Sequence, residues 1–158
     1  MAFSEEYFMG LAIKKARQGI GDGQAPFGCA IVKGDALLSC EHDKVWSRTD
    51  ITAHAQIMAI REACKKLKSV NLMGCTLYCT CEPCDMCYSA AAWARVAKIC
   101  FAATSDDAIK AGFSDRKITE AQLNKLQDLD IEIRSGLMSD EGRVLLEQYR
   151  EIVGDRIY

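Results

Sequence analysis

Apolar patterns typical of strands and of helices alternate along the whole 158-residue chain. Short apolar runs alternate with longer segments in which apolar residues recur every three to four positions. The patterns predict strands at 27–33, 36–40, 75–79, 98–102 and 131–134, and helices at 4–19, 52–67, 84–95, 105–111 and 139–153. Such alternation indicates an α/β fold with a central sheet covered on both faces. Because no Pro-, Ser- or Gly-rich linker divides the chain, we expect one domain over residues 1–158.

The charge balance narrows the classes of partner. The chain contains 20 Lys and Arg residues and 22 Asp and Glu residues, which gives a net charge of −2. Proteins that bind nucleic acid usually carry an excess of basic residues, so a small neutral substrate fits better than a nucleic acid. No apolar run reaches the roughly 18 residues of a membrane span, and the N-terminus lacks the pattern of a signal peptide. We therefore expect no membrane contact and a cytoplasmic location.

Three residues with metal-ligand side chains stand at the starts of two predicted helices. His54 lies in TAHAQ, in the expected first turn of the helix at 52–67, and Cys84 and Cys87 lie in PCDMC, in the expected first turn of the helix at 84–95. Cysteines at positions i and i+3 share a helix face, and a catalytic zinc takes three protein ligands and leaves one position open for water. We predict one Zn²⁺ per chain. A redox or structural Cys pair and a core histidine are the alternatives.

The chain contains nine cysteines. Disulfides are rare in the reducing cytosol, so we expect the seven cysteines outside the predicted centre to be reduced packing residues.

The motifs together resemble one enzyme family. The sequence His-x-Gln, followed by Pro-Cys-x-x-Cys, is similar to the signature of the zinc-dependent cytidine deaminase superfamily. Within it, the chain most resembles guanine deaminase and related small nucleobase and nucleoside deaminases. This closer similarity extends over the segments at 25–32, 50–67, 75–87 and 111–115. The resemblance implies the cytidine deaminase-like fold, which is three-layer α/β/α with a central mixed five-stranded sheet. It also implies a homodimer and hydrolytic deamination of a purine base or nucleoside, with guanine converted to xanthine and ammonia by a water molecule that zinc activates.

Gln56 is the main departure from the family pattern. The family carries a glutamate two positions after the ligating histidine, and this glutamate moves protons between the water, the ring nitrogen and the leaving amine. A carboxamide has no titratable proton, and general acid–base catalysis contributes roughly 10²–10⁴-fold. We therefore expect a nearly inactive chain that still binds zinc and substrate. An engineered Glu→Gln change is favoured over a natural pseudoenzyme, because the rest of the site is intact.

The resemblance assigns a further set of residues to substrate binding: Phe27, Asp43, Ala55, Trp93, Asp115 and Tyr158. Asp43 stands where the family has an asparagine. A carboxylate only accepts hydrogen bonds, so Asp43 favours a base or sugar edge that offers donors. Asp115 is also expected to help relay protons, and Tyr158 to reach its own site or that of a partner. Ordinary packing or a surface position is the alternative for each residue.

Three other functions compete with guanine deamination. A cytosine deaminase shares the zinc motifs, although the AGFSD segment and the terminal tyrosine favour the purine branch. A non-catalytic zinc-containing binding protein is consistent with Gln56. A tRNA adenosine deaminase is disfavoured by the net charge.

Overall fold

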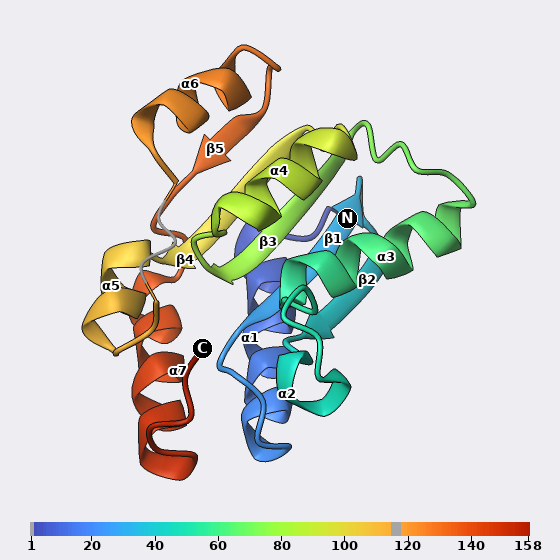
Figure 1. The fold of residues 1–158 in the computed structure, drawn as a ribbon. Helices are drawn as coiled ribbons and strands as arrows, with labels where there is room; N and C mark the ends of the chain where they lie inside the picture. The colour runs from blue at the N-terminus through green and yellow to red at the C-terminus, as the bar shows by residue number, and fades with distance from the viewer. Residues whose placement is uncertain (1, 115–117) are drawn as a thin grey trace.

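The computed structural model describes residues 2–114 and 118–158 (Figure 1). The helices are α1 (Glu5–Gly21), α2 (Val45–Arg48), α3 (Ala55–Leu67), α4 (Asp85–Trp93), α5 (Ser105–Lys110), α6 (Glu120–Gln127) and α7 (Ser139–Ile152). The strands are β1 (Gly28–Lys33), β2 (Ala36–His42), β3 (Cys75–Cys81), β4 (Lys98–Ala103) and β5 (Glu132–Arg134). Every strand and helix predicted from the sequence overlaps one of these elements.

The strands form one mixed sheet in the order β2-β1-β3-β4-β5. β1 is antiparallel to both β2 and β3, whereas β3, β4 and β5 are parallel to one another. The tight turn between β1 and β2 contains Gly34 at φ 59°, a conformation that glycine adopts at little cost. Parallel strands need a crossover, which α4 supplies between β3 and β4. The predicted mixed five-stranded sheet is confirmed.

Two apolar cores lie on opposite faces of the sheet. α1 and α7 pack on one face, in one apolar cluster with Ala30 and Val32 of β1, and α3 and α4 pack on the other, in a second cluster with Cys29 and Ile31. This division follows from the strand itself, because successive side chains point to opposite faces. The three layers are visible in Figure 1 and confirm the predicted α/β/α architecture.

Close packing between α1 and β1 fixes the start of that strand. A Cβ at Gly28 would collide with the carbonyl oxygen of Ala12, so this position accepts only glycine without a shift of the backbone. The Gly28 N–H also donates to Thr80 Oγ1 at 3.0 Å, which ties β1 to the end of β3. Phe27, the residue before Gly28, is thereby held beside the edge of the sheet at which β3 ends.

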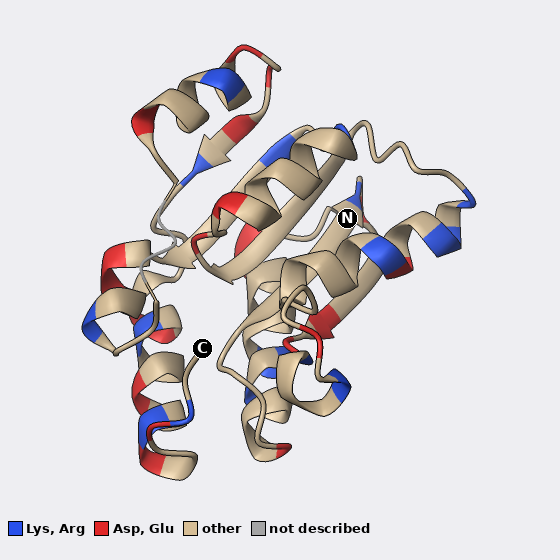
Figure 2. Ribbon diagram, in the orientation of Figure 1, with Lys and Arg blue, Asp and Glu red and all other residues tan. Residues whose placement is uncertain are grey.

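The surface carries both signs of charge along the same helices. α3 and α7 each show acidic and basic side chains interspersed (Figure 2). No helix within residues 2–114 and 118–158 combines the length and the apolar character that crossing a membrane requires. All nine cysteines lie among the described residues, and all are free thiols.

Two helices were not predicted from the sequence. α2 lies in a stretch for which the patterns predict neither a strand nor a helix, because four residues are too few to show a helical period. α6 buries only Leu126, so it lacks the apolar stripe on which the prediction depended. A local signal was nevertheless present. Thr119 and Gln122 form a capping box, and the S/T-x-x-E/Q pattern marks a helix start.

Candidate active site

The three expected ligands lie at the starts of two helices. His54 is the N-cap of α3, Cys84 is the N-cap of α4, and Cys87 follows in the first turn of α4. We predicted His54 and Cys84 within the first turns, but both lie one residue before their helix, with extended backbone conformations. Neither side chain forms a capping hydrogen bond with its own helix, so both remain available as ligands.

The topology brings these helix starts together. β3 ends at Cys81, so Cys84 follows directly after the carboxyl end of a parallel strand. Open α/β sheets place their ligand sites at this edge. α3 packs against α4 on the same face of the sheet, and the two N-termini point their partial positive charge toward one region.

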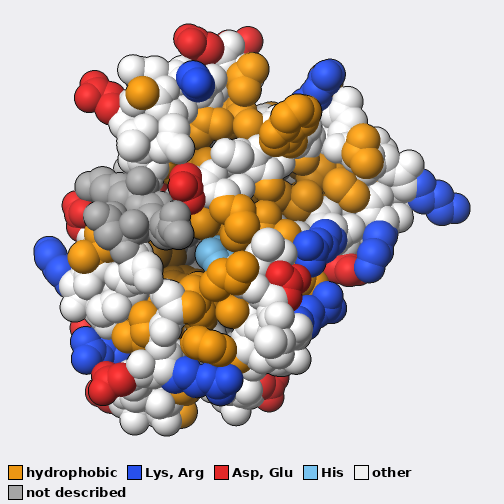
Figure 3. All heavy atoms as spheres, in the orientation of Figure 1, with side chains coloured by type: hydrophobic (Ala, Val, Ile, Leu, Met, Phe, Trp, Pro, Cys, Tyr) orange, Lys and Arg blue, Asp and Glu red, His pale blue; other side chains and the backbone are white. Residues whose placement is uncertain are grey.

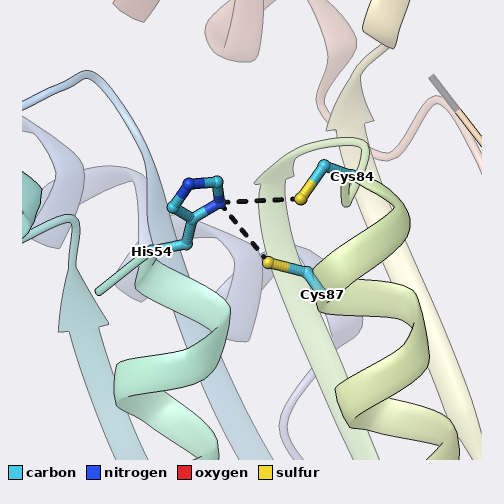
Figure 4. Close-up of side chains that lie close together, drawn as sticks. All are labelled: His54, Cys84 and Cys87. Atoms are coloured by element: carbon cyan, nitrogen blue, oxygen red, sulfur yellow. Dashed lines mark hydrogen bonds between the residues drawn. The ribbon is translucent and has the colours of Figure 1, made fainter. Parts of the chain in front are cut away.

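The geometry of the three side chains fits a zinc ion. His54 Nδ1 lies 3.6 Å from Cys84 Sγ and 3.6 Å from Cys87 Sγ (Figure 4), and all three ligand atoms lie within 4.8 Å of one another. Bonds of about 2.3 Å to sulfur and about 2.0–2.1 Å to nitrogen at a tetrahedral angle predict a separation of about 3.6 Å between S and N. Two thiolates and one imidazole are also the ligand types that zinc prefers.

The thiols differ in acidity without metal. A hydrogen bond from Cys87 and a second from His54 lower the pKa of Cys84 to about 4, against the effect of burial. The hydrogen bond to Cys84, together with burial, raises the pKa of Cys87 well above its usual value. Burial alone lowers the pKa of His54, but the bond to Cys84 and its charge outweigh burial and raise it. Metal binding needs Cys87 as a thiolate and His54 as a neutral imidazole, so it competes with protons for both side chains.

His54, Cys84 and Gln56 line a cavity of about 570 Å³. The other lining side chains include Phe27, Ile51, Glu82, Asp85, Met86, Ser89, Ser105, Phe113, Gln122 and Tyr158. In Figure 3 a histidine is visible in a hollow surrounded by apolar side chains. A mostly apolar cavity with a few polar groups and a metal centre is typical of a small-molecule site.

The comparison with known families agrees with this geometry. The family described as the cytidine and deoxycytidylate deaminase zinc-binding region matches residues 3–103, a segment that contains all three ligands. The chain belongs to this deaminase family. The cofactor of the family is therefore zinc, and His54, Cys84 and Cys87 form the site that fits it.

Relatives of this deaminase include enzymes for two kinds of substrate. The chain is 42% identical over 113 residues to the guanine deaminase of Bacillus subtilis (strain 168), which covers 71% of this chain and 72% of that enzyme. It is 41% identical over 99 residues to the tRNA-specific adenosine deaminase of Aquifex aeolicus (strain VF5), which covers 63% and 66%. The solved guanine deaminase of Nitrosomonas europaea superposes with a TM-score of 0.89 at 29% identity and covers 96% of this chain and 86% of that chain.

Gln56 lies next to the metal centre of the deaminase. It occupies the second position of α3, its exposed fraction is 5%, and its Oε1 accepts a hydrogen bond from Cys87 Sγ at 3.6 Å. The carboxamide is thus buried and lines the cavity.

Two of the predicted substrate residues form part of an aromatic wall. Phe27 and Tyr158 both line the cavity, and Phe113 lies between them, with ring centroids 5.0 Å from Phe27 and 6.4 Å from Tyr158. The ring of Tyr158 also lies 5.4 Å from that of His54. The C-terminal residue therefore lies at the site of its own chain in this structure.

Asp43 lies behind this wall. It is fully buried and does not line the cavity. The Tyr158 hydroxyl donates to its Oδ2, and the Val45 N–H donates to its Oδ1 at 3.0 Å. Burial raises the pKa of the Asp43 carboxyl, although the bonds from Tyr158 and Val45 oppose this shift. In this structure Asp43 holds Tyr158 in place, and a direct contact with substrate stays a prediction.

The structure does not bring Ala55 or Trp93 into the cavity. Ala55 is fully buried at the start of α3 and is absent from the lining. Trp93 is 87% exposed at the end of α4 and lines a second hollow. It stands six positions after Cys87, and at about 100° per residue it faces another side of the helix. Asp115 lies outside the described residues.

Several lining residues were missed by sequence reasoning. Glu82 lines the cavity, and its Oε2 accepts a hydrogen bond from the Ser105 N–H at 2.8 Å. Phe113 lies in the AGFSD segment that carried the resemblance, but only its packing against Phe27 reveals its place. Gln122 was missed together with α6.

Proposed function

We propose that this deaminase scaffold acts on a purine, with guanine as the substrate and xanthine and ammonia as the products. A three-ligand centre that opens into an aromatic-walled cavity, in a chain similar to guanine deaminases over most of its length, carries the proposal. A zinc ion held by His54, Cys84 and Cys87 would lower the pKa of a bound water molecule toward about 7. Phe27 and Tyr158 offer flat faces against which a heterocycle can stack.

Gln56 limits the reaction under this proposal. Its side chain holds a hydrogen bond to Cys87 but has no proton to exchange at neutral pH. Loss of a general acid–base group costs roughly 10²–10⁴-fold in rate. The chain with Gln56 therefore binds zinc and purine and turns over very slowly. Asp115 as a second proton-relay group stays a prediction.

Restoring the carboxylate tests the proposal. We expect Gln56→Glu, with one zinc per chain, to release ammonia from guanine at least 100-fold faster than the unchanged chain. Gln127→Glu, the same change at the exposed end of α6, should leave the rate unaltered. If the Gln56→Glu protein releases no ammonia from any base or nucleoside, the enzyme proposal is wrong and a non-catalytic binding protein remains.

A tRNA adenosine deaminase is the second candidate, favoured by the Aquifex aeolicus relative. The described residues that line the cavity include Glu82 and Asp85 and no Lys or Arg, which is unfavourable for a phosphodiester chain. The rates at which the Gln56→Glu protein releases ammonia from guanine, from cytosine and from an adenosine-containing anticodon stem–loop would rank the candidates. Faster ammonia release from cytosine or from the RNA than from guanine would overturn our choice.

We also propose a homodimer located in the cytoplasm, with its two sites near the subunit interface. The resemblance to the family supports this assembly. Light scattering should give twice the mass of one chain, and the mass of a single chain would refute it.

A further inference from the structure

The chain turns back on itself after α7. In Figure 1 the segment that follows this helix reverses its direction and runs back along it. Tyr149 of α7 supports the reversal, because its hydroxyl donates a hydrogen bond to the carbonyl oxygen of Arg156. Tyr158 then reaches the cavity, where its ring lines the wall beside His54. The C-terminal tail, residues 154–158, therefore supplies part of the wall.

The short helix α2 provides a second set of contacts to the C-terminal tail. The guanidinium carbon of Arg156 lies 4.3 Å from the centroid of the Trp46 ring. The ring of Trp46 also lies 5.6 Å from that of Tyr158, at an angle of 64°. A cation over an aromatic face and an edge-to-face pair of rings are both attractive. The position of α2 therefore helps to decide where the tail lies.

Asp43 joins the C-terminal tail to α2 through one carboxylate. Its Oδ2 accepts a hydrogen bond from the Tyr158 hydroxyl, and its Oδ1 accepts one at 3.0 Å from the N–H of Val45, the first residue of α2. The side chain is fully buried and does not line the cavity. A buried donor that loses its acceptor pays the cost of desolvation, so removal of this carboxylate should loosen the tail and α2 together.

The backbone of Asp43 is bonded to the other end of the aromatic wall. Its N–H donates to the carbonyl oxygen of Phe27 at 3.0 Å, and Phe27 lines the cavity together with Tyr158. One residue thus holds both ring-bearing segments, the first through its main chain and the second through its side chain. A purine that packs against these rings would respond to a change at Asp43 without touching it.

We propose that Asp43 is a positioning residue, which acts on a bound purine through Tyr158 and not by a contact of its own. Asp43, α2 and the C-terminal tail form one clamp beside the cavity. This inference rests on the proposed function. Both carboxylate oxygens already accept hydrogen bonds from the protein, so the clamp uses no donor of the base. A direct hydrogen bond from the base to Asp43 is the alternative.

A double-mutant cycle on guanine binding separates the two roles. We expect calorimetry with the zinc-loaded chain, in which Gln56 keeps turnover slow, to show an affinity lowered about fivefold by Tyr158→Phe and about tenfold by Asp43→Leu. The double variant should lose about tenfold, and not the roughly fiftyfold product of two independent effects. Asp128→Leu, at an exposed aspartate after α6, is the matched control and should leave the affinity unchanged.

Asp43→Asn tests the same question with a milder change. The amide oxygen still accepts the Val45 N–H, and the amide nitrogen can donate to the hydroxyl oxygen of Tyr158, so the clamp keeps both bonds. We expect a guanine affinity within about twofold of that of the unchanged chain. If a carboxylate oxygen instead accepted a hydrogen bond from the base, the substitution would put a donor in its place, and the affinity would fall about tenfold.

The clamp also has a readout that needs no purine. The chain contains two tryptophans, so in a Trp93→Phe background the fluorescence comes from Trp46 alone. Its quenching by acrylamide reports whether the C-terminal tail covers the ring. We expect the quenching constant to rise in Asp43→Leu and in Tyr158→Phe and to stay unchanged in Asp128→Leu.

The outcomes separate the clamp from the proposed function. An unchanged quenching constant in Asp43→Leu overturns the clamp, whatever the affinity for guanine. Additive losses in the double variant, or a tenfold loss in Asp43→Asn, overturn the indirect role in favour of a direct contact. Asp43→Asn decides this point if Asp43→Leu does not fold. If the unchanged chain binds no guanine while the quenching responds as expected, the proposed function fails and the clamp stands.

Discussion

The metal centre and the aromatic wall of the same cavity are built in different ways. The ligands come from the starts of two adjacent helices, and His54 and Cys87 are 33 residues apart. The wall joins Phe27, Phe113 and Tyr158, and Tyr158 is tied to Asp43, which is 115 positions earlier in the chain. The centre therefore depends on short-range helix signals, whereas the wall depends on the C-terminal tail folding back. Zinc binding and substrate fit should respond separately to mutation.

The largest expected effect is on zinc content, and it distinguishes the cysteines of the metal centre from the other cysteines. Cys84→Ser should reduce the zinc content from one per chain to near zero, because it removes one of three ligands. Cys64→Ser, which changes a cysteine of α3 outside the metal centre, should leave the zinc content at one per chain. Metal analysis after gel filtration measures both. A Cys84→Ser protein with full zinc would show that the centre is assembled differently.

Next in size is the loss of the central ring of the wall. Phe113 is 7% exposed and packs against Phe27, Tyr149 and Tyr158, so Phe113→Ala should lower the free energy of unfolding by about 3–5 kcal/mol. Zinc content should not change at temperatures where the protein remains folded. Phe3→Ala, at a position 52% exposed, should cost no more than about 0.5 kcal/mol. Urea unfolding measures both, and equal costs would contradict the packing described for the wall.

A smaller effect is expected from the bond that ties the tail to the core. Tyr158→Phe removes the hydroxyl that donates to buried Asp43 and should cost about 1–3 kcal/mol, with zinc retained. Tyr7→Phe, at a 46% exposed ring, is the matched control and should be near neutral. If the two variants unfold at the same denaturant concentration, the tail does not depend on Asp43.

The smallest effect concerns pH. Burial raises the pKa of Asp43 in the folded chain above that of an unfolded aspartate, near 3.9, so the native state binds the proton more tightly. Stability should therefore fall as pH rises from about 4 through the native pKa of Asp43. Asp43→Asn removes this titration. The difference in unfolding free energy between the two metal-free proteins should grow across that window and then level off. A difference in unfolding free energy that does not change with pH would contradict the raised pKa of Asp43.

The sequence predicted the centre better than the wall for physical reasons. Histidine and cysteine near helix starts can be recognised from capping, periodicity and ligand chemistry, and the error of one residue at His54 and Cys84 concerned only the boundary between N-cap and first turn. The sheet was also predictable, because alternation along β1 places Cys29 and Ile31 on one face and Ala30 and Val32 on the other.

The wall depends on long-range contacts that a pattern does not encode. Phe113 lies in an irregular segment, and its role appears only where the chain returns to Phe27. α6 buries too little apolar surface to show a helical period, so Gln122 was missed with it. Trp93 was assigned to the cavity by resemblance, and the rotation of α4 turns it toward the second hollow.

The central claim is that an intact zinc site lacks its proton carrier at Gln56. Xanthine formed from guanine in the presence of excess zinc-loaded protein tests this most directly, because a single turnover is then sufficient for detection. We predict complete conversion by Gln56→Glu within the time in which the unchanged chain converts at most about one hundredth as much. Equal conversion by both proteins would contradict it.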